Sequence, residues 1–208
     1  MQKTLQQKFT DLFQSHATDL SLQEKFWQEI QKHYTSSKRH YHTLLHLENL
    51  FGELQPLHEK LEDWDTIQFS LFYHDIIYKS FKSNNEEESA LLAVERLRQI
   101  GYSEEKIIKC ENQILATKSH NFSDTDTNFF TVADLSVLGK DWETYAVYYH
   151  QIRKEYSLYP DFLYNNGRKK VLEHFLDMES IFKTEYFQNK YENQARLNIE
   201  KELQILDK

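Results

Sequence analysis

A histidine and an aspartate stand side by side inside an apolar stretch of this sequence. The segment FSLFYHDIIYKS is rich in Phe, Leu and Ile, yet His74 and Asp75 lie at its centre. Burying two ionisable side chains without partners is costly. A divalent cation would compensate both, because imidazole nitrogen and carboxylate oxygen are ligands for metals such as Mn, Fe, Ni, Co and Zn. Water held by such an ion loses a proton near neutral pH, so the pair predicts hydrolytic chemistry.

Further candidate residues are spread unevenly along the chain, which has ten histidines among its 208 residues. The segment RHYHTLLH holds His40, His42 and His46, and the last two are four residues apart, on one face of a helix. His120 closes LATKSH, and Asp134 lies in the otherwise apolar TVADLSVLG. Each of these residues alone also has a structural explanation, as a hydrogen-bonded surface histidine or as a helix-capping aspartate.

Together, these segments resemble a known superfamily. The order of His46, the adjacent His74 and Asp75, and then Asp134 resembles the H…HD…D signature of the HD-domain metal-dependent phosphohydrolases. The resemblance extends over roughly residues 36–203 and is carried by RHYHTLLH, LFYHDIIY, NNEEESA, LATKSH, ADLSVLG, IRKEY and ENQARLNIEKEL. It implies that these four residues bind one divalent metal ion, which could be Mn, Fe, Ni, Co, Zn or Mg.

The resemblance also implies a reaction, the hydrolysis of a phosphomonoester or phosphodiester in a small phosphorylated molecule such as a nucleotide. Asp75 would orient the attacking water, and His120 would contact phosphate or protonate the leaving oxygen, or bind a second ion if one is present. Val132 stands two residues before Asp134, where the family often carries another acid, and this argues against a second ion. Two alternatives are a catalytically silent module that binds metal or nucleotide, and a helical interaction domain with chance histidines.

Binding of a phosphate requires local positive charge, and basic residues near the histidines are the candidates. Arg39 precedes the first histidine cluster, Lys79 and Lys82 follow the His-Asp pair, and Lys118 precedes His120. Each basic residue also has an ordinary explanation as a solvated surface side chain. Glu86, in NNEEESA, is a favourable first-turn acid of a helix, and the resemblance makes it a candidate residue near the substrate.

Long helices must position these residues, because helix breakers are rare in the chain. Four Gly and two Pro are too few for the many turns of a sandwich or barrel. Apolar residues recur every three to four positions in residues 42–54, which predicts a core-facing helix, while FFTVADLSVLG fits a short strand or a brief helix. Similar patterns predict helices over residues 22–34, 64–78, 103–118, 142–156, 167–182 and 186–206. We therefore expect an all-α fold, a single-domain helical bundle of the HD-domain type over residues 1–208.

Capping patterns predict where two of the helices begin. Ser21 followed by Glu24 is a capping-box pattern. Asn84 or Asn85 is placed to cap a helix that starts with three glutamates and that Gly101 ends.

Composition limits the partners and the location of the protein. Lys and Arg number 25 against 33 Asp and Glu, giving a formal charge of -8, which argues against binding to long nucleic acids. Cys110 is the only cysteine, so no disulfide can form within the chain, as expected in a reducing compartment. The sequence also lacks a signal-peptide core and an apolar run long enough to span a membrane. We expect a cytoplasmic protein without membrane contact, and the oligomeric state stays open.

Overall fold

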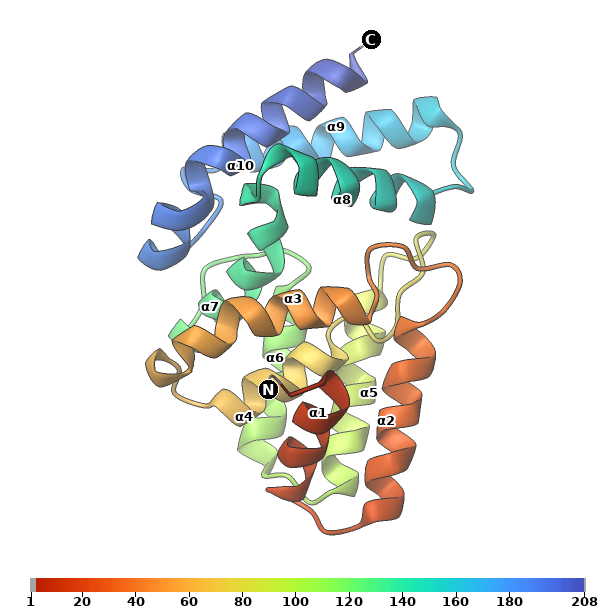
Figure 1. Cartoon of the computed structure of the whole chain (residues 1–208), viewed down its shortest axis with the longest axis vertical. Coiled ribbons are helices and arrows are strands. Elements are labelled where there is room, and N and C mark those ends of the chain that lie inside the picture. The colour runs from red at the N-terminus through yellow and green to blue at the C-terminus, as the bar shows by residue number, and fades with distance from the viewer. Residues whose placement is uncertain (1–2, 208) are drawn as a thin grey trace. The chain divides into compact units, whose positions relative to one another are not determined.

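The chain folds into helices throughout, which confirms the all-α prediction (Figure 1). The computed structural model describes residues 3–207, and these form ten α-helices and two 3₁₀ helices without any strand. The α-helices are α1 (Leu5–Gln14), α2 (Leu20–Tyr34), α3 (Leu44–Leu54), α4 (Trp64–Tyr73), α5 (Asn85–Gln99), α6 (Glu104–Ala116), α7 (Thr125–Asp134), α8 (Trp142–Glu155), α9 (Asp161–Asp177) and α10 (Glu185–Leu206). The 3₁₀ helices are η1 (Gln55–Lys60) and η2 (Leu135–Gly139).

The helices divide into two compact units. The first unit ends at Thr131 and the second begins at Val132. The sequence predicted a single domain over residues 1–208, and the single domain stays a prediction.

Helix α4 is central to the first unit and packs against α3, α5 and α6 (Figure 1). Its sequence WDTIQFSLFY is largely apolar, and residues 66, 67 and 69–73 are all buried. A helix that is apolar on every side is stable only where neighbouring helices cover it. The helix ends at Tyr73 and not at the predicted Tyr78, so His74 and Asp75 follow its last turn.

Helix α2 begins earlier than predicted, and a different residue caps it. Asp19 is the N-cap, and its side chain accepts hydrogen bonds from the backbone N–H groups of Ser21 and Leu22 at 2.9 and 3.1 Å. Ser21 therefore lies in the first turn, and the capping box that we predicted for Ser21 and Glu24 is wrong. An aspartate at the N-cap satisfies the same free N–H groups, so the helix starts one residue after Asp19.

Helix α5 has the expected extent but not the expected cap. Asn84 is at the N-cap position without a side-chain capping bond, and its amide instead donates to Glu88 at 3.0 Å. Gly101 follows the helix with φ 69°, a left-handed conformation that glycine adopts without strain, as predicted.

Two further helices differ from the sequence patterns. Helix α1 was not predicted, although Leu5, Phe9 and Phe13 recur at helical spacing and are buried. Helix α9 was predicted over residues 167–182, but it begins directly after Pro160 and ends at Asp177. Proline at a helix start removes an N–H group that has no partner within the helix, and this explains the earlier beginning.

In the second unit, α10 packs against α9 and η2, and α8 also packs against η2. The segment FFTVADLSVLG, for which strand and helix were both open, forms the end of α7 and η2. Gly139 ends η2 so close to α10 that a Cβ atom there would lie 2.7 Å from the backbone oxygen of Tyr191. The contact between η2 and α10 therefore requires glycine at this position.

No helix among residues 3–207 combines the length and the apolar character that a membrane crossing needs.

Candidate metal centre

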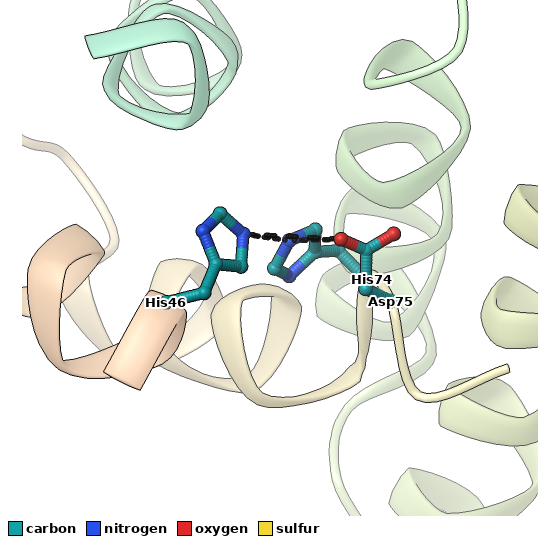
Figure 2. Close-up of side chains that lie close together, drawn as sticks. All are labelled: His46, His74 and Asp75. Atoms are coloured by element: carbon teal, nitrogen blue, oxygen red, sulfur yellow. Dashed lines mark hydrogen bonds and ion pairs between the residues drawn. The ribbon is translucent and has the colours of Figure 1, made fainter. Parts of the chain in front are cut away.

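His46, His74 and Asp75 lie together within the first unit (Figure 2). His46 comes from the first turn of α3, whereas His74 and Asp75 directly follow α4. Each residue contributes one donor atom, and these atoms all lie within 4.8 Å of one another. The His46 and His74 side chains are 1% exposed and that of Asp75 is 15% exposed, so the carboxylate is the member of the cluster that solvent reaches.

The spacing of the donor atoms fits a single metal ion. Nε2 of His74 lies 3.1 Å from Nε2 of His46 and 3.1 Å from Oδ2 of Asp75, and the remaining separation, from His46 to Asp75, is 3.8 Å. Metal–nitrogen bonds are about 2.1 Å long, so two ligands at right angles on one ion lie about 3 Å apart. The three side chains therefore have both the chemistry and the spacing of a partial ligand set.

A backbone carbonyl fixes the His74 ring in the orientation and tautomer that a metal ligand needs. Nδ1 of His74 lies 2.9 Å from the carbonyl oxygen of Leu71. Because a carbonyl only accepts hydrogen bonds, Nδ1 carries the hydrogen, and Nε2 of the neutral ring keeps its lone pair. Nε2 is the atom that faces His46 and Asp75, and such support of a ligand histidine is typical of metal sites.

Arg39 ties together the two chain segments that carry the cluster. Its guanidinium donates to the carbonyl of His42 at 3.1 Å and to the carbonyl of Ile76 at 2.8 Å. The group also lies over the rings of Tyr34 and Tyr78, with 4.7 and 5.7 Å to the ring centroids. Arg39 is 7% exposed, so its charge is held in a fixed position next to the site.

Helix α2 places two further polar side chains beside these segments. The backbone N–H of Asp75 donates to the hydroxyl of Tyr34 at 3.3 Å. Burial, and then the positive charge of Arg39, lower the pKa of His33. The fixed positive charge of Arg39 thus affects the titration of a neighbouring side chain. Contact of Arg39 with a substrate phosphate stays a prediction.

The segment NNEEESA, singled out in the sequence, holds the loop that follows Asp75. The Asn85 side chain accepts a hydrogen bond from the N–H of Lys79 and donates one to its carbonyl, both at 3.0 Å. Ser89 does the same for Ile77, at 3.1 and 3.2 Å. Two side chains of α5 therefore satisfy both backbone groups of two loop residues, and this gives the segment a structural role near the site.

The acids of the same segment neutralise two of the lysines that were predicted to bind substrate. Lys118 donates to Glu87 at 2.5 Å, which lowers the pKa of that carboxyl, and it lies 4.0 Å from Glu86. Lys82 pairs with Glu88 at 2.5 Å. These pairs link the loop and the end of α6 to the first turn of α5. Binding of substrate by Lys118 and Glu86 stays a prediction, as it does for the exposed Lys79.

Two further residues were predicted for the site, His120 and Asp134. His120 follows α6, donates its backbone N–H to the carbonyl of Ala116 at 2.9 Å, and has φ 51°. A left-handed conformation is uncommon in residues other than glycine, and such residues are concentrated at functional sites. Asp134 ends α7 and belongs to the second unit. Both roles, His120 as a catalytic residue and Asp134 as the fourth ligand, stay predictions.

The sequence left the roles of His42 and its aromatic neighbours open. The His42 ring lies against the Tyr78 ring with 4.0 Å between centroids, and its edge meets Tyr41 at 5.0 Å. Nε2 of His42 is 3.8 Å from Oδ2 of Asp75. The signal in the sequence was the alternation of histidine and tyrosine in RHYH together with a tyrosine three residues after the aspartate.

Comparison of the chain with protein-family models, with curated proteins and with solved structures gives no match. The structure thus establishes an all-helical fold and a cluster of His46, His74 and Asp75. Membership of the HD-domain superfamily stays a prediction.

Proposed function

We propose that this chain is a metal-dependent phosphohydrolase of the HD-domain type that acts on a small phosphorylated molecule such as a nucleotide. The observation that carries the proposal is the convergence of His46, His74 and Asp75, with the ring of His74 fixed by the Leu71 carbonyl. Their order along the chain is that of the superfamily signature, and Asp134 would complete the ligand set.

The burial of each residue indicates its role in the proposed reaction. The two buried histidines hold the ion, and the carboxylate of Asp75, which is 15% exposed, also accepts a hydrogen bond from water. When bound, the divalent ion lowers the pKa of a coordinated water and withdraws charge from a phosphoryl oxygen. Such a water would lose one proton to solvent, its oxygen would add to phosphorus as the bond to the leaving oxygen breaks, and His120 would supply a proton to that leaving oxygen.

The charge of the protein favours a small substrate over a polyanion. The chain carries a formal charge of -8, which repels long nucleic acids. Among the candidate phosphate-binding residues, Lys82 and Lys118 are paired with glutamates. Arg39 is the cation that burial and two carbonyl contacts fix beside the cluster. A substrate with one or a few phosphates matches this limited positive charge.

Metal binding is the first test of the proposal. Metal-free protein is titrated with Mn²⁺, Fe²⁺, Ni²⁺, Co²⁺, Zn²⁺ and Mg²⁺, and the number of bound ions and their affinity are measured. We expect one ion per chain, and a loss of affinity in His74→Ala that exceeds the about 10- to 100-fold cost of removing an outer-shell partner. His58→Ala is the matched control, because His58 is an exposed histidine of η1. Unchanged affinity in both His74→Ala and Asp75→Ala would refute the proposal.

Turnover is the second test and separates an enzyme from a silent binding module. The metal-loaded protein is screened for phosphate release from nucleotides, phosphomonoesters and phosphodiesters. Release that requires both the metal and Asp75 supports the phosphohydrolase. Thermal stabilisation by metal and nucleotide without any release would instead favour the silent module, since binding to the folded state alone stabilises it.

A further inference from the structure

His42 lies beside the candidate metal centre. Its Nε2 is 3.8 Å from Oδ2 of Asp75, the same oxygen that lies 3.1 Å from His74 and 3.8 Å from His46. One carboxylate oxygen therefore has the Nε2 atoms of three histidines around it. The His42 side chain is 16% exposed, whereas the other two histidine side chains are 1% exposed.

His42 does not belong to the ligand set, although it contacts a member of it. Among the described residues, the group with all donor atoms within 4.8 Å of one another consists of His46, His74 and Asp75. Ligands on opposite sides of one ion are about 4.2 Å apart for bonds of about 2.1 Å. His42 therefore stands too far from at least one of the three to bind the same ion with them.

Aromatic contacts and one backbone hydrogen bond hold His42 in place. Its ring lies against the Tyr78 ring at an interplanar angle of 30° and packs edge-on with Tyr41, and the backbone carbonyl of His42 accepts a hydrogen bond from Arg39. A side chain that is fixed in this way, with a nitrogen aimed at the carboxylate, is suited to position a small ligand.

The separation of His42 and Asp75 is too long for a direct hydrogen bond, and a water molecule can bridge two polar groups at this distance. An oxygen atom can lie about 2.8 Å from two atoms that are 3.8 Å apart. Such an oxygen would have to donate a hydrogen bond to the Asp75 carboxylate, and it would accept one from His42 when Nε2 carries the hydrogen. Water does both, whereas a fully ionised phosphate has no hydrogen to donate.

We propose that His42 and Asp75 together hold one water molecule, and that this water is the nucleophile of the hydrolysis. The inference rests on the proposed function for the identity of the reaction. It adds His42 to the catalytic residues, as the group that fixes the position of the water oxygen without binding the ion.

The test compares Mn²⁺-loaded wild type with His42→Phe and His42→Gln. Phenylalanine keeps the stacking on Tyr78 and removes the nitrogen, whereas glutamine returns an N–H group at similar reach. His58→Phe is the control for a histidine-to-phenylalanine change at an exposed position. The readouts are the number and affinity of bound Mn²⁺, kcat and KM for phosphate release, and crystal structures of the loaded wild type and His42→Phe. Circular dichroism verifies that each variant is folded.

We expect His42→Phe to bind one Mn²⁺ with wild-type affinity and to lose about 10²- to 10⁴-fold in kcat with little change in KM. His42→Gln should recover part of kcat. The wild-type crystal structure should show a water oxygen within hydrogen-bond distance of both His42 and Asp75, and His42→Phe should lack it.

Three results would overturn the inference. Loss of Mn²⁺ stoichiometry or affinity in His42→Phe would make His42 a ligand. An unchanged kcat would exclude it from the reaction, and a loaded crystal structure without the bridging water would remove its basis. If the loaded protein releases no phosphate from any substrate, the proposed function fails, while the crystal structures still decide whether His42 and Asp75 hold a water.

Discussion

Two ion pairs join α9 to the C-terminal end of α10 and differ strongly in burial, and this difference allows a sharp prediction. Arg168 donates to both carboxylate oxygens of Glu202 at 2.8 and 2.9 Å, and the two side chains are 8% and 1% exposed. The hydroxyl of Tyr145 also donates to Glu202. Lys169 pairs with Asp207 at 2.5 Å, but these side chains are 27% and 68% exposed. The two pairs therefore differ in how much solvation was lost to form them.

The perturbation is Glu202→Gln, which keeps the size of the side chain and removes its charge. Arg168 is then left as a buried cation without a counter-charge, and breaking such a pair costs about 3–5 kcal/mol. A change of 1 kcal/mol shifts the Tm of a chain of this size by about 2–4 °C, so the Tm should fall by roughly 6–20 °C. Asp207→Asn removes an exposed pair worth about 0–1 kcal/mol and should lower the Tm by at most about 4 °C.

The assay is thermal and urea unfolding of both variants, followed by circular dichroism. The double variant Arg168→Met/Glu202→Leu adds a second arm, because replacing a whole buried pair by apolar residues is often neutral or stabilising. It should recover most of the stability that Glu202→Gln loses. Equal losses in Glu202→Gln and Asp207→Asn, or a double variant less stable than Glu202→Gln, would refute the reasoning from burial.

Two further predictions concern the second unit. The ammonium nitrogen of Lys183 is buried without a hydrogen-bond partner among the described residues, and burial lowers its pKa to about 8. Because the unfolded chain binds this proton more tightly, with a pKa of about 10.4, the free energy of unfolding should rise from about pH 8 to pH 10. Lys183→Met should therefore raise the Tm at pH 7 by more than at pH 10, and an equal gain in calorimetric scans at both pH values would contradict this. Gly139→Ala should cost about 1–3 kcal/mol in urea unfolding, because the new Cβ would lie 2.7 Å from the Tyr191 backbone oxygen. Gly167→Ala, on α9 with no atom within 4 Å of the new Cβ, should instead stabilise the helix by up to about 1 kcal/mol, and equal effects of the two changes would show that the close contact is unimportant.

Apolar periodicity and the scarcity of glycine and proline were enough to predict the fold class. A helix in a globular protein is stable when its apolar face packs against other elements. Apolar residues spaced every three to four positions mark that face in the sequence. The ends of helices were less predictable, because several residues compete to satisfy the same free N–H groups. Asp19 caps α2 in place of the predicted Ser21, and Asn84 turns to Glu88.

The candidate site likewise has features that the local sequence predicts and contacts between distant residues that it does not predict. His46, His74 and Asp75 were predicted from adjacent or helically spaced residues and from the order of the signature. The contacts of Arg39 with Ile76 and of Tyr34 with Asp75 join residues about forty positions apart. No periodicity encodes such contacts, since they depend on how the helices pack, and they became visible only in the structure.

The end of α4 explains why the histidine and aspartate interrupt an apolar run where they do. The last four carbonyls of a helix lack a partner within it, and Leu71 is among the last four residues of α4. The Nδ1–H of His74 satisfies this carbonyl, and by doing so leaves Nε2 with its lone pair toward His46 and Asp75. One turn earlier in the helix, the carbonyl three residues before a histidine would already be bonded to a backbone N–H group. The apolar residues of α4 thus bury the helix and place its open end where a histidine can act as a ligand.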